Sequence, residues 1–338
     1  MGLRVGVPRG LYFDTFQPMW ESFFRTVGVE CVVSGLTNKE TVDLGVLTTV
    51  TDACAPIKVF QGHAASLVGK VDRIFVPRMV NVESKFVFCP KFLGLPDMVR
   101  ATIDGLPDII DTRIDLRKGP LVLFRTLYRL ARDLGANTAI AARAAYSAAR
   151  TLRNSLSGLA DEEPLPCVDQ SKARMAVIGY PYLVHDHFVN CGLLKLLRSM
   201  GVTAITMEQV AEADVRRQVK RLGKDIFWQY SNRALGASYH LMENGDIDGL
   251  IHVTAFGCGP DAIVDKYLEI DSRDSKLPFL SVTVDEHSGE AGIQTRIEAF
   301  ADMVIRKRSL ISTPEGRIEP DNSGSSGEKR KPTGRRVS

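Results

Sequence analysis

The feature of this sequence that most constrains its fold is a strand–helix–strand pattern that occurs twice. The first copy is RVGVPRGLYFDTFQPMWESFFRTVGVECVV, and the second, in the other half of the chain, is MAVIGYPYLVHDHFVNCGLLKLLRSMGVTAI. In each copy an apolar strand leads to an aromatic-rich turn, a helix, a Gly-Val pair and another strand. Alternating strands and helices are typical of parallel sheets covered by helices on both faces. The repeat therefore predicts two related α/β lobes.

The rest of the chain extends this pattern on both sides of a long helical segment. In the first half we expect strands at 3–7, 29–33, 73–76 and 108–110, with helices at 14–27, 37–50, 57–69 and from residue 96. In the second half we expect strands at 174–179, 202–206, 247–254 and 278–284, with helices at 187–200, 207–220, 226–243, after residue 258 and at 290–308. The Ala- and Arg-rich stretch 121–159 predicts the helical connection.

The fold class predicted is therefore α/β, with two Rossmann-like or flavodoxin-like lobes whose parallel sheets are joined by a helical segment. We expect the first lobe at 1–118, the helical bridge and linker at 119–172, and the second lobe at 173–310. The remaining stretch, 311–338, is rich in Ser, Gly and Lys and is expected to be disordered.

Charge and hydropathy exclude two classes of partner. The net charge of the 338-residue chain is only +3, and the segment 313–338 holds six basic against four acidic residues. The body is nearly balanced, so we expect no nucleic-acid-binding surface. The sequence has no apolar run of 18 residues, and its start lacks the apolar core of a signal peptide. These patterns predict a cytoplasmic protein with no membrane partner.

Three of the six cysteines stand in loops beside glycine or proline. Cys54 occurs in TDACAP, Cys89 in FCPKF and Cys258 in FGCGPD, where the last follows a strand directly. Ligands of open α/β sheets gather outside the carboxyl ends of the strands. Cys54 and Cys258 also precede helices, whose N-termini favour thiolate over thiol. Two interpretations stay open: three thiols that converge on one centre, or three unrelated packed thiols.

If the three thiols converge, the ligand type favours an iron–sulfur cluster. Three thiolates without a histidine suit such a cluster better than catalytic zinc. A zinc ion held by the same thiolates and His63 is the alternative, although the spacing from Cys54 is not a recurrent one. Among the other cysteines, Cys31 is expected to be a core thiol, and Cys167 falls in the linker. Cys191 is expected to be a packing residue, with a place in the site from the second lobe as the alternative.

The acidic stretch VDEHSGEAGIQTRIEAF can also be interpreted in two ways, as a helix start with structural acids or as part of a functional site. Acids in a first helical turn complement the helix dipole, which accounts for Glu290. Asp285, Glu286 and His287 follow the apolar strand 278–284, where functional residues tend to collect, and we predict Glu286 and His287 as the catalytic candidates. Arg296 could pair with an acid or hold an anion.

A basic loop and an aromatic turn complete the set of candidate residues. Arg78, Lys85 and Lys91 surround Cys89 and are expected either to bind phosphates or to be solvated. The sequence has no GxxxxGK[ST] or GxGxxG loop, so it contains no recognisable nucleotide motif. The aromatic residues of 180–188 are expected to pack around a turn.

Four runs carry a resemblance to a known family: ACAPIKVFQGHA, VPR followed by CPKFLGLPDM, FGCGPD, and DEHSGEAGIQTRIEAFADM. Together they resemble the activase-related branch of the 2-hydroxyacyl-CoA dehydratase and double-cubane cluster superfamily, from about Leu3 to Arg308. The resemblance implies a two-lobed protein whose Cys54, Cys89 and Cys258 hold a [4Fe–4S] or double-cubane cluster. It also implies an ATP-hydrolysing activase as partner, because no actin-like nucleotide-binding pattern precedes Leu3.

The function expected from the sequence is thus that of an iron–sulfur protein of the 2-hydroxyacyl-CoA dehydratase type. It would accept low-potential electrons from the ATP-dependent activase for reductive or radical chemistry, with an acyl-CoA as the candidate substrate. As an enzyme it would be a dehydratase-like lyase or a low-potential reductase component. The alternative is a non-catalytic electron relay or scaffold that carries the cluster for a dehydratase complex. A second copy of the chain or a dehydratase subunit would be its other partner.

Overall fold

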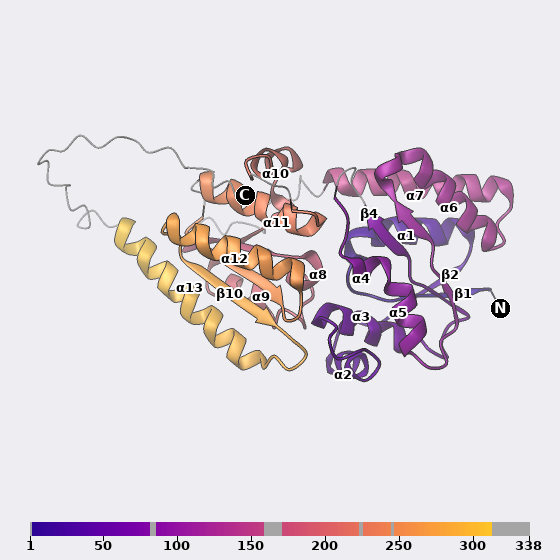
Figure 1. Cartoon of the computed structure of the whole chain (residues 1–338), viewed down its shortest axis with the longest axis horizontal. Coiled ribbons are helices and arrows are strands. Elements are labelled where there is room, and N and C mark those ends of the chain that lie inside the picture. The colour runs from indigo at the N-terminus through magenta and orange to yellow at the C-terminus, as the bar shows by residue number, and fades with distance from the viewer. Residues whose placement is uncertain (1, 82–85, 159–170, 223–225, 245–246, 313–338) are drawn as a thin grey trace, which may run out of the picture.

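Each half of the chain folds around its own four-stranded parallel sheet, as the repeat predicts (Figure 1). The computed structural model describes residues 2–81, 86–158, 171–222, 226–244 and 247–312. The two lobes lie side by side along the long axis of the molecule, and the α/β fold with parallel sheets is confirmed. None of the helices in these ranges combines the length and the apolar character needed to cross a bilayer.

The first lobe has the strand order β2-β1-β3-β5. Its strands are β1 (Arg4–Val7), β2 (Glu30–Val33), β3 (Arg73–Phe75) and β5 (Asp108–Ile110), with a separate parallel pair of β4 (Arg78–Asn81) and β6 (Arg113–Asp115). Its helices are α1 (Phe13–Val27), α2 (Lys39–Leu47), α3 (Ala55–Ala65), α4 (Pro90–Leu93), α5 (Leu95–Thr102), η1 (Leu116–Lys118), α6 (Pro120–Asp133) and α7 (Thr138–Gly158).

The second lobe has the strand order β10-β9-β7-β8. Its strands are β7 (Ala173–Gly179), β8 (Val202–Thr206), β9 (Gly249–Ala255) and β10 (Phe279–Val284). Its helices are α8 (Pro181–Val184), α9 (Leu193–Ser199), η2 (Met207–Gln209), α10 (Glu212–Val219), α11 (Gln229–Asn244), α12 (Gly259–Asp274) and α13 (Glu290–Ser312). The central strands β7 and β9 are almost wholly buried, as strands covered on both faces must be.

Three local differences from the predicted elements have clear causes. The stretch 121–159 forms two helices because Gly135 turns the chain with a positive φ of 89°. Both helices belong to the first lobe, where α7 packs against α1 and α6. The helix predicted at 187–200 starts only at Leu193, because the Asn190 side chain accepts bonds from the backbone of Gly192 and Leu193 and caps it there. Strand β4, which pairs with β6, escaped prediction because it begins directly after Pro77, where the predicted strand 73–76 ends.

The strand order fixes where a ligand site can form. In the first lobe the chain proceeds from β1 to β2 on one side and then to β3 on the other. In the second lobe it proceeds from β7 to β8 and then to β9 on the opposite side. The carboxyl ends at such a reversal leave a crevice, which is where ligands of open α/β sheets bind. The loops after β1 and β7 both lie at these reversals.

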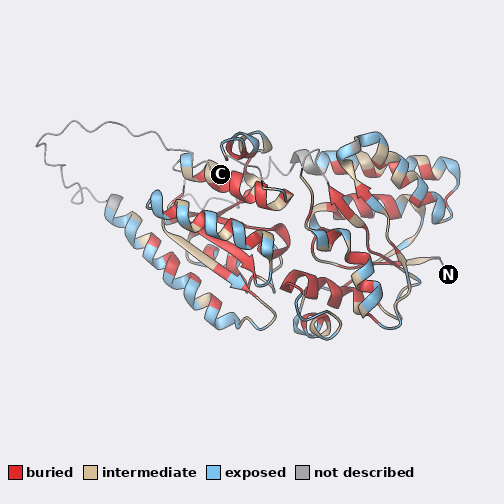
Figure 2. Cartoon of the chain, in the orientation of Figure 1, coloured by how far each residue is buried: buried red, intermediate tan, exposed pale blue. Residues whose placement is uncertain are grey.

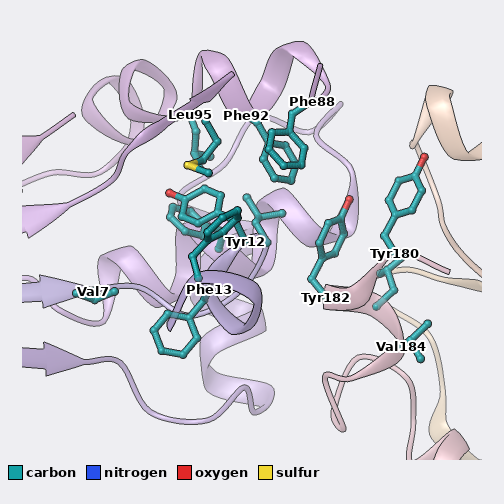
Figure 3. Packing of buried hydrophobic residues seen from close by; sticks show 14 of the residues in the cluster. Val7, Tyr12, Phe13, Phe88, Phe92, Leu95, Tyr180, Tyr182 and Val184 are labelled. Atoms are coloured by element: carbon teal, nitrogen blue, oxygen red, sulfur yellow. The ribbon is translucent and has the colours of Figure 1, made fainter. Parts of the chain in front are cut away.

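Helix α3 is buried along nearly its whole length, from Ala55 to Ala64. Figure 2 shows this helix as an unbroken red segment beside the second lobe, in contrast to α13, whose surface alternates between exposed and buried. Aromatic rings extend the contact between lobes. Figure 3 shows Phe92 of the first lobe and Tyr182 of the second, whose ring centroids lie 6.1 Å apart. The ring centroid of Tyr230, also of the second lobe, lies 6.4 Å from that of Phe92.

The position of α3 depends on a close crossing with α2. A Cβ atom on Gly62 would lie 1.8 Å from the carbonyl oxygen of Thr41, and one on Gly45 would lie 1.9 Å from the carbonyl oxygen of Lys58. Both clashes are with backbone atoms, which cannot rotate away as a side chain could. The two glycines therefore let the helices touch backbone to backbone, and this contact sets the depth of α3 in the molecule.

We predict that Gly62→Ala lowers the free energy of unfolding by roughly 1–3 kcal/mol or more, since an overpacked contact must be relieved by moving a helix. Urea denaturation followed by circular dichroism measures the change. The matched control is Gly292→Ala in α13, where a Cβ would meet nothing within 4 Å. Helix propensity alone should make that variant slightly more stable. Equal stability of the two variants would contradict the crossing described above.

Candidate functional site

A cleft of about 620 Å³ lies between the lobes at the carboxyl ends of the strands. Its first-lobe wall comes from the loops after β1 and β2, and its second-lobe wall from the loops after β7 and β10. Its polar lining includes Arg9, Asp14, Thr37, His185, Asp186, His187, Ser288 and Glu290. The volume is within the range of pockets that hold small molecules and cofactors. This cleft is the candidate functional site.

The loop after β1 holds an arginine in a fixed place on the first wall. The Arg9 backbone N–H donates to the Ser34 hydroxyl over 2.9 Å, and its side-chain Nε donates to the Ser34 carbonyl over 3.0 Å. The guanidinium carbon also lies 5.0 Å from the centre of the Phe13 ring, which is a cation–π distance. The next two residues, Gly10 and Leu11, both have positive φ values, 95° and 54°. Such strain in a non-glycine residue is concentrated at functional sites.

A chain of hydrogen bonds crosses the cleft from this arginine to the second lobe. Ser34 contacts His63 Nδ1 at 3.0 Å, and His63 Nε2 contacts the Thr37 hydroxyl at 3.0 Å. The Thr37 hydroxyl donates to the Asp186 carboxylate over 2.5 Å. An ionised carboxylate only accepts, so the Thr37 hydroxyl donates to Asp186 and accepts from Nε2–H of His63. In a neutral ring Nδ1 then accepts from the Ser34 hydroxyl.

The electrostatics agree with a neutral imidazole. The His63 side chain is only 1% exposed, and this burial lowers its pKa to about 4, with the positive charge of Arg9 adding to the effect. On the far side, the Asp186 carboxylate also accepts from the backbone N–H groups of Phe188 and Val189. Its charge is thus compensated by three donors, one of which belongs to the other lobe.

A second polar contact between lobes lies deeper. Lys58 of α3 forms a salt bridge with Glu286 from the loop after β10, and the two side chains are 8% and 13% exposed. Burial alone would raise the pKa of the Glu286 carboxyl, but the hydrogen bond and charge of Lys58 hold it below the usual value. Glu286 therefore joins the lobes in this structure, and its predicted catalytic role stays a prediction.

Cys54, Cys89 and Cys258 line one small pocket between the lobes, together with Tyr180, Tyr182 and Trp228. Each cysteine is the residue before a helix, at the start of α3, α4 and α12 respectively, and each helix has proline in its first turn. Gly257 brings the chains close, since a Cβ there would lie 3.6 Å from Cys54 Cα. The fold thus brings together three thiols that are far apart in the sequence.

The pocket does not fit the cluster that the sequence led us to expect. Its volume is about 20 Å³, close to the least space that one water molecule needs. Burial raises the pKa of the Cys54 and Cys258 thiols, and the nearby Asp261 carboxylate raises that of Cys258 further. Metals bind thiolates, whereas these surroundings favour neutral thiols. The assignment of the thiols as ligands, and the iron–sulfur cofactor itself, stay predictions from the resemblance.

A buried charged group supports the turn that carries Cys258. His252 in β9 has no exposed surface and lies 3.2 Å from the Asp261 carboxylate and 2.8 Å from that of Asp265. Burial disfavours its charge, but the two carboxylates raise its pKa to about 9. Asp265 in turn accepts a hydrogen bond from Ser281 of β10. The imidazolium therefore ties the start of α12 to two strands.

The remaining residues of the acidic stretch have structural partners. Asp285 accepts from the backbone of His287 and from the Ser288 hydroxyl, which closes a turn. Glu290 accepts from Gln294, and Arg296 donates to the carbonyl of Ser281 rather than to an acid. His287 is exposed, lines a smaller cavity of about 360 Å³ next to the cleft, and stays a catalytic prediction.

The candidate phosphate-binding residues that the structure describes and the proposed zinc ligand also have structural partners. Arg78 is paired with Asp97 and Asp111, which leaves it no charge to offer a phosphate, and Lys91 donates to the Asp52 carbonyl. Both ring nitrogens of His63 have hydroxyl partners, so the zinc alternative lacks its fourth ligand. Lys85, Cys167 and the segment 313–338 lie outside the described residues.

Two more cysteines had sequence-based expectations. Cys31 in β2 is a half-buried thiol against the core, and burial with the charge of Glu21 raises its pKa to about 11. Cys191 is buried and lines the cleft with a positive φ of 53°. The sequence favoured a packing role for it, with a place in the site from the second lobe as the alternative.

The sequence analysis missed the cleft residues Arg9, Thr37, Asp186 and His187. It noted the stretch 180–188 for its aromatics, and Tyr180 and Tyr182 do pack together with Tyr230. The internal repeat was the signal that could have found Arg9, Asp186 and His187, whereas Thr37 follows β2 and lies outside the repeat. The repeat places VPRGLY and GYPYLVHDH at the same point in each lobe, directly after the first strand.

These features define the class: a two-lobed α/β protein with a polar cleft between parallel sheets. Residues 4–210, more than half of the chain, match the family described as the CoA enzyme activase uncharacterised domain, and the chain belongs to that family. A search of curated proteins found no match.

The family match corrects the function expected from the sequence. An iron–sulfur protein of the dehydratase type is the wrong description, because the matching family is that of the activase and not of the cluster-bearing dehydratase. Within the described ranges, moreover, no three His, Cys, Asp or Glu side chains are placed to hold a metal ion. The iron–sulfur, [4Fe–4S] and metal-binding descriptions fail on the same findings, as does the alternative of a cluster-carrying relay or scaffold.

The expected partners change as well. A separate ATP-hydrolysing activase is not supported as a partner, because the activase description applies to this chain itself. The activase-related part of the resemblance is confirmed at the level of the family.

We predict that Lys58→Met lowers the free energy of unfolding by roughly 1–3 kcal/mol, between the values for surface and for fully buried pairs, because it leaves the Glu286 charge without a partner. Glu286→Leu should behave similarly. The double variant should be more stable than the sum of the two single changes predicts, which a double-mutant cycle in urea measures. Strict additivity would show that the salt bridge does not join the lobes.

The pKa of His63 predicts an acid sensitivity. A pKa of about 4 in the folded protein against 6.5 unfolded means that the unfolded chain binds more protons between these values. The contribution of neutral His63 to the free energy of unfolding is fully present above pH 6.5. It is lost as the pH falls towards 4, and the loss amounts to about 3 kcal/mol at most.

Between pH 4 and 6.5, His63→Gln should lower the number of protons taken up on unfolding by about one, which makes the unfolding free energy depend less steeply on pH. Urea denaturation at several pH values between 4 and 7 gives the slope. The exposed His287→Gln is the control and should keep the slope of the unmodified protein. An unchanged slope in His63→Gln would refute the neutral, bridging imidazole.

Proposed function

We propose that this protein activates a CoA-dependent enzyme and that the cleft between the lobes is its working site. The observation that carries the proposal is the reach of the family match. Residues 4–210 include Arg9 and Thr37 on one wall of the cleft and Asp186 and His187 on the other. The match ends before Cys258 and before the loop after β10, so the matched region contains the first-lobe wall, the β7 loop of the second wall and two of the three pocket thiols.

The two-lobed geometry suits a protein that activates a partner protein through a conformational change. Two lobes that meet over a polar cleft can close or open around a ligand, and such motions transmit binding to a distant surface. At the rim of the cleft the Thr37–Asp186 hydrogen bond joins the lobes, and deeper in the molecule the buried Lys58–Glu286 pair joins them. The rim can therefore separate while α3 keeps the lobes joined.

The partner that we propose is a CoA-dependent dehydratase, and the likeness of four sequence runs to the 2-hydroxyacyl-CoA dehydratase group supports this choice. ATP dependence belongs to the same proposal, since activases of that group use ATP. We also propose a cytoplasmic location. Support comes from the five cysteines in the described ranges, all of which are free thiols, as is usual in a reducing compartment.

The test is an activation assay with purified components. A CoA-dependent dehydratase from the same source is assayed anaerobically with ATP and a reductant, with and without this protein. We predict that dehydration depends on the protein and that Asp186→Ala reduces activation by roughly tenfold, the effect of losing one charge-assisted hydrogen bond.

Asp43→Ala is the matched control for that assay. Asp43 is an acid on the surface of the first lobe that contacts only Lys39 among the described residues, so its loss should leave activation unchanged. Full dehydratase activity without this protein, across the candidate dehydratases of the source, would contradict the proposed function.

A further inference from the structure

Arg9 presents unused donors to the cleft. Its backbone N–H and its Nε are engaged with Ser34, and its ring contact with Phe13 restricts the side chain. Within the described ranges, however, its two terminal amino groups have no hydrogen-bond or ion-pair partner. An arginine fixed in this way has already lost much of its conformational entropy, so binding through its free amino groups is favoured.

His187 lies on the opposite wall and is also available. Its ring has no side-chain partner in the part of the chain that the structure describes, and it is exposed to the cleft. Gly192 makes room for it, since a Cβ at that position would lie 3.1 Å from the His187 ring carbon Cε1. Gly192 also has a positive φ of 72°, which favours glycine there.

We propose that the cleft binds a phosphate-bearing ligand, with the phosphate held between Arg9 and His187. The two amino groups of the arginine fork and one imidazole nitrogen are three donors from two lobes, and a terminal phosphate has three oxygens to accept from them. The cleft of about 620 Å³ has room for the rest of a nucleotide-sized molecule. A ligand held from both walls would also favour the closed arrangement of the lobes.

The acids of the cleft determine how much negative charge it accepts. Asp186 is compensated by Thr37 and two backbone N–H groups, and Glu290 accepts from Gln294. Asp14 is the third acid of the lining. These carboxylates favour one phosphate at the Arg9 position over a polyanion spread through the cleft.

This inference deepens the proposed function and rests on it only for the choice of ATP and coenzyme A as probes. Isothermal titration calorimetry of the full chain is carried out with ATP, coenzyme A and inorganic phosphate, and with adenosine and pantetheine as matched probes without phosphate. We expect at least one phosphate-bearing probe to bind and neither phosphate-free probe to do so. The comparison of ATP with coenzyme A identifies which kind of molecule carries the phosphate.

Two variants locate the site. Arg9→Gln and His187→Ala should each weaken binding by roughly tenfold to hundredfold, as expected for charge-assisted hydrogen bonds. Arg4→Gln, which removes an arginine of the same lobe that pairs with Glu30, should bind like the unmodified protein. His187 is exposed, so its variant should fold even if Arg9→Gln does not, and thermal melting checks both.

The inference is overturned if no phosphate-bearing probe binds, or if His187→Ala binds the probe as tightly as the unmodified protein. Dehydratase activation that persists while no probe binds would overturn it and leave the proposed function intact. Probe binding that depends on Arg9 and His187, without any activation of a dehydratase, would support the inference and count against the proposed function.

Discussion

The structure depends on the burial of one helix, α3, between the two lobes. A charged side chain on so deeply buried a helix needs a partner, because an unpaired buried charge is strongly destabilising. Lys58 finds Glu286 in the second lobe, and His63 finds Ser34 and Thr37 beside it. The glycines at the crossing with α2 allow this depth. The relative placement of the lobes follows from these contacts.

The cleft is a consequence of that placement. Once α3 is fixed, the loops after β1 and β2 face those after β7 and β10, and the carboxyl ends of two parallel sheets enclose one space. Two non-glycine residues have positive φ values here: Leu11, next to the cleft residue Gly10, and Cys191, which lines the cleft. The hydrogen-bond chain from Arg9 to Asp186 runs through the buried His63, whose burial lowers its pKa to about 4 and keeps the imidazole neutral near neutral pH.

Much of the fold could be predicted from the sequence, and less of the site. Strands such as 174–179 are marked by apolar runs and helices such as α1 by an amphipathic period, so two α/β lobes followed directly. The meeting of Cys54, Cys89 and Cys258 could be expected from loop positions, but their burial could not, and burial decides whether a thiol is charged. Arg9 and Asp186 were missed because each is unremarkable in its own loop. Only the three-dimensional approach of the two copies of the repeat gives them a common role.

Hydrogen–deuterium exchange of the free protein tests the central claim most directly. If α3 joins the lobes through buried contacts, its backbone amides from Val59 to Ala64 should exchange in the slowest class, together with those of β7 and β9. The cleft loops around Arg9 and His187 should exchange far faster. Exchange of α3 at the rate of these loops would mean that the lobes part freely, and the account of the cleft would then be wrong.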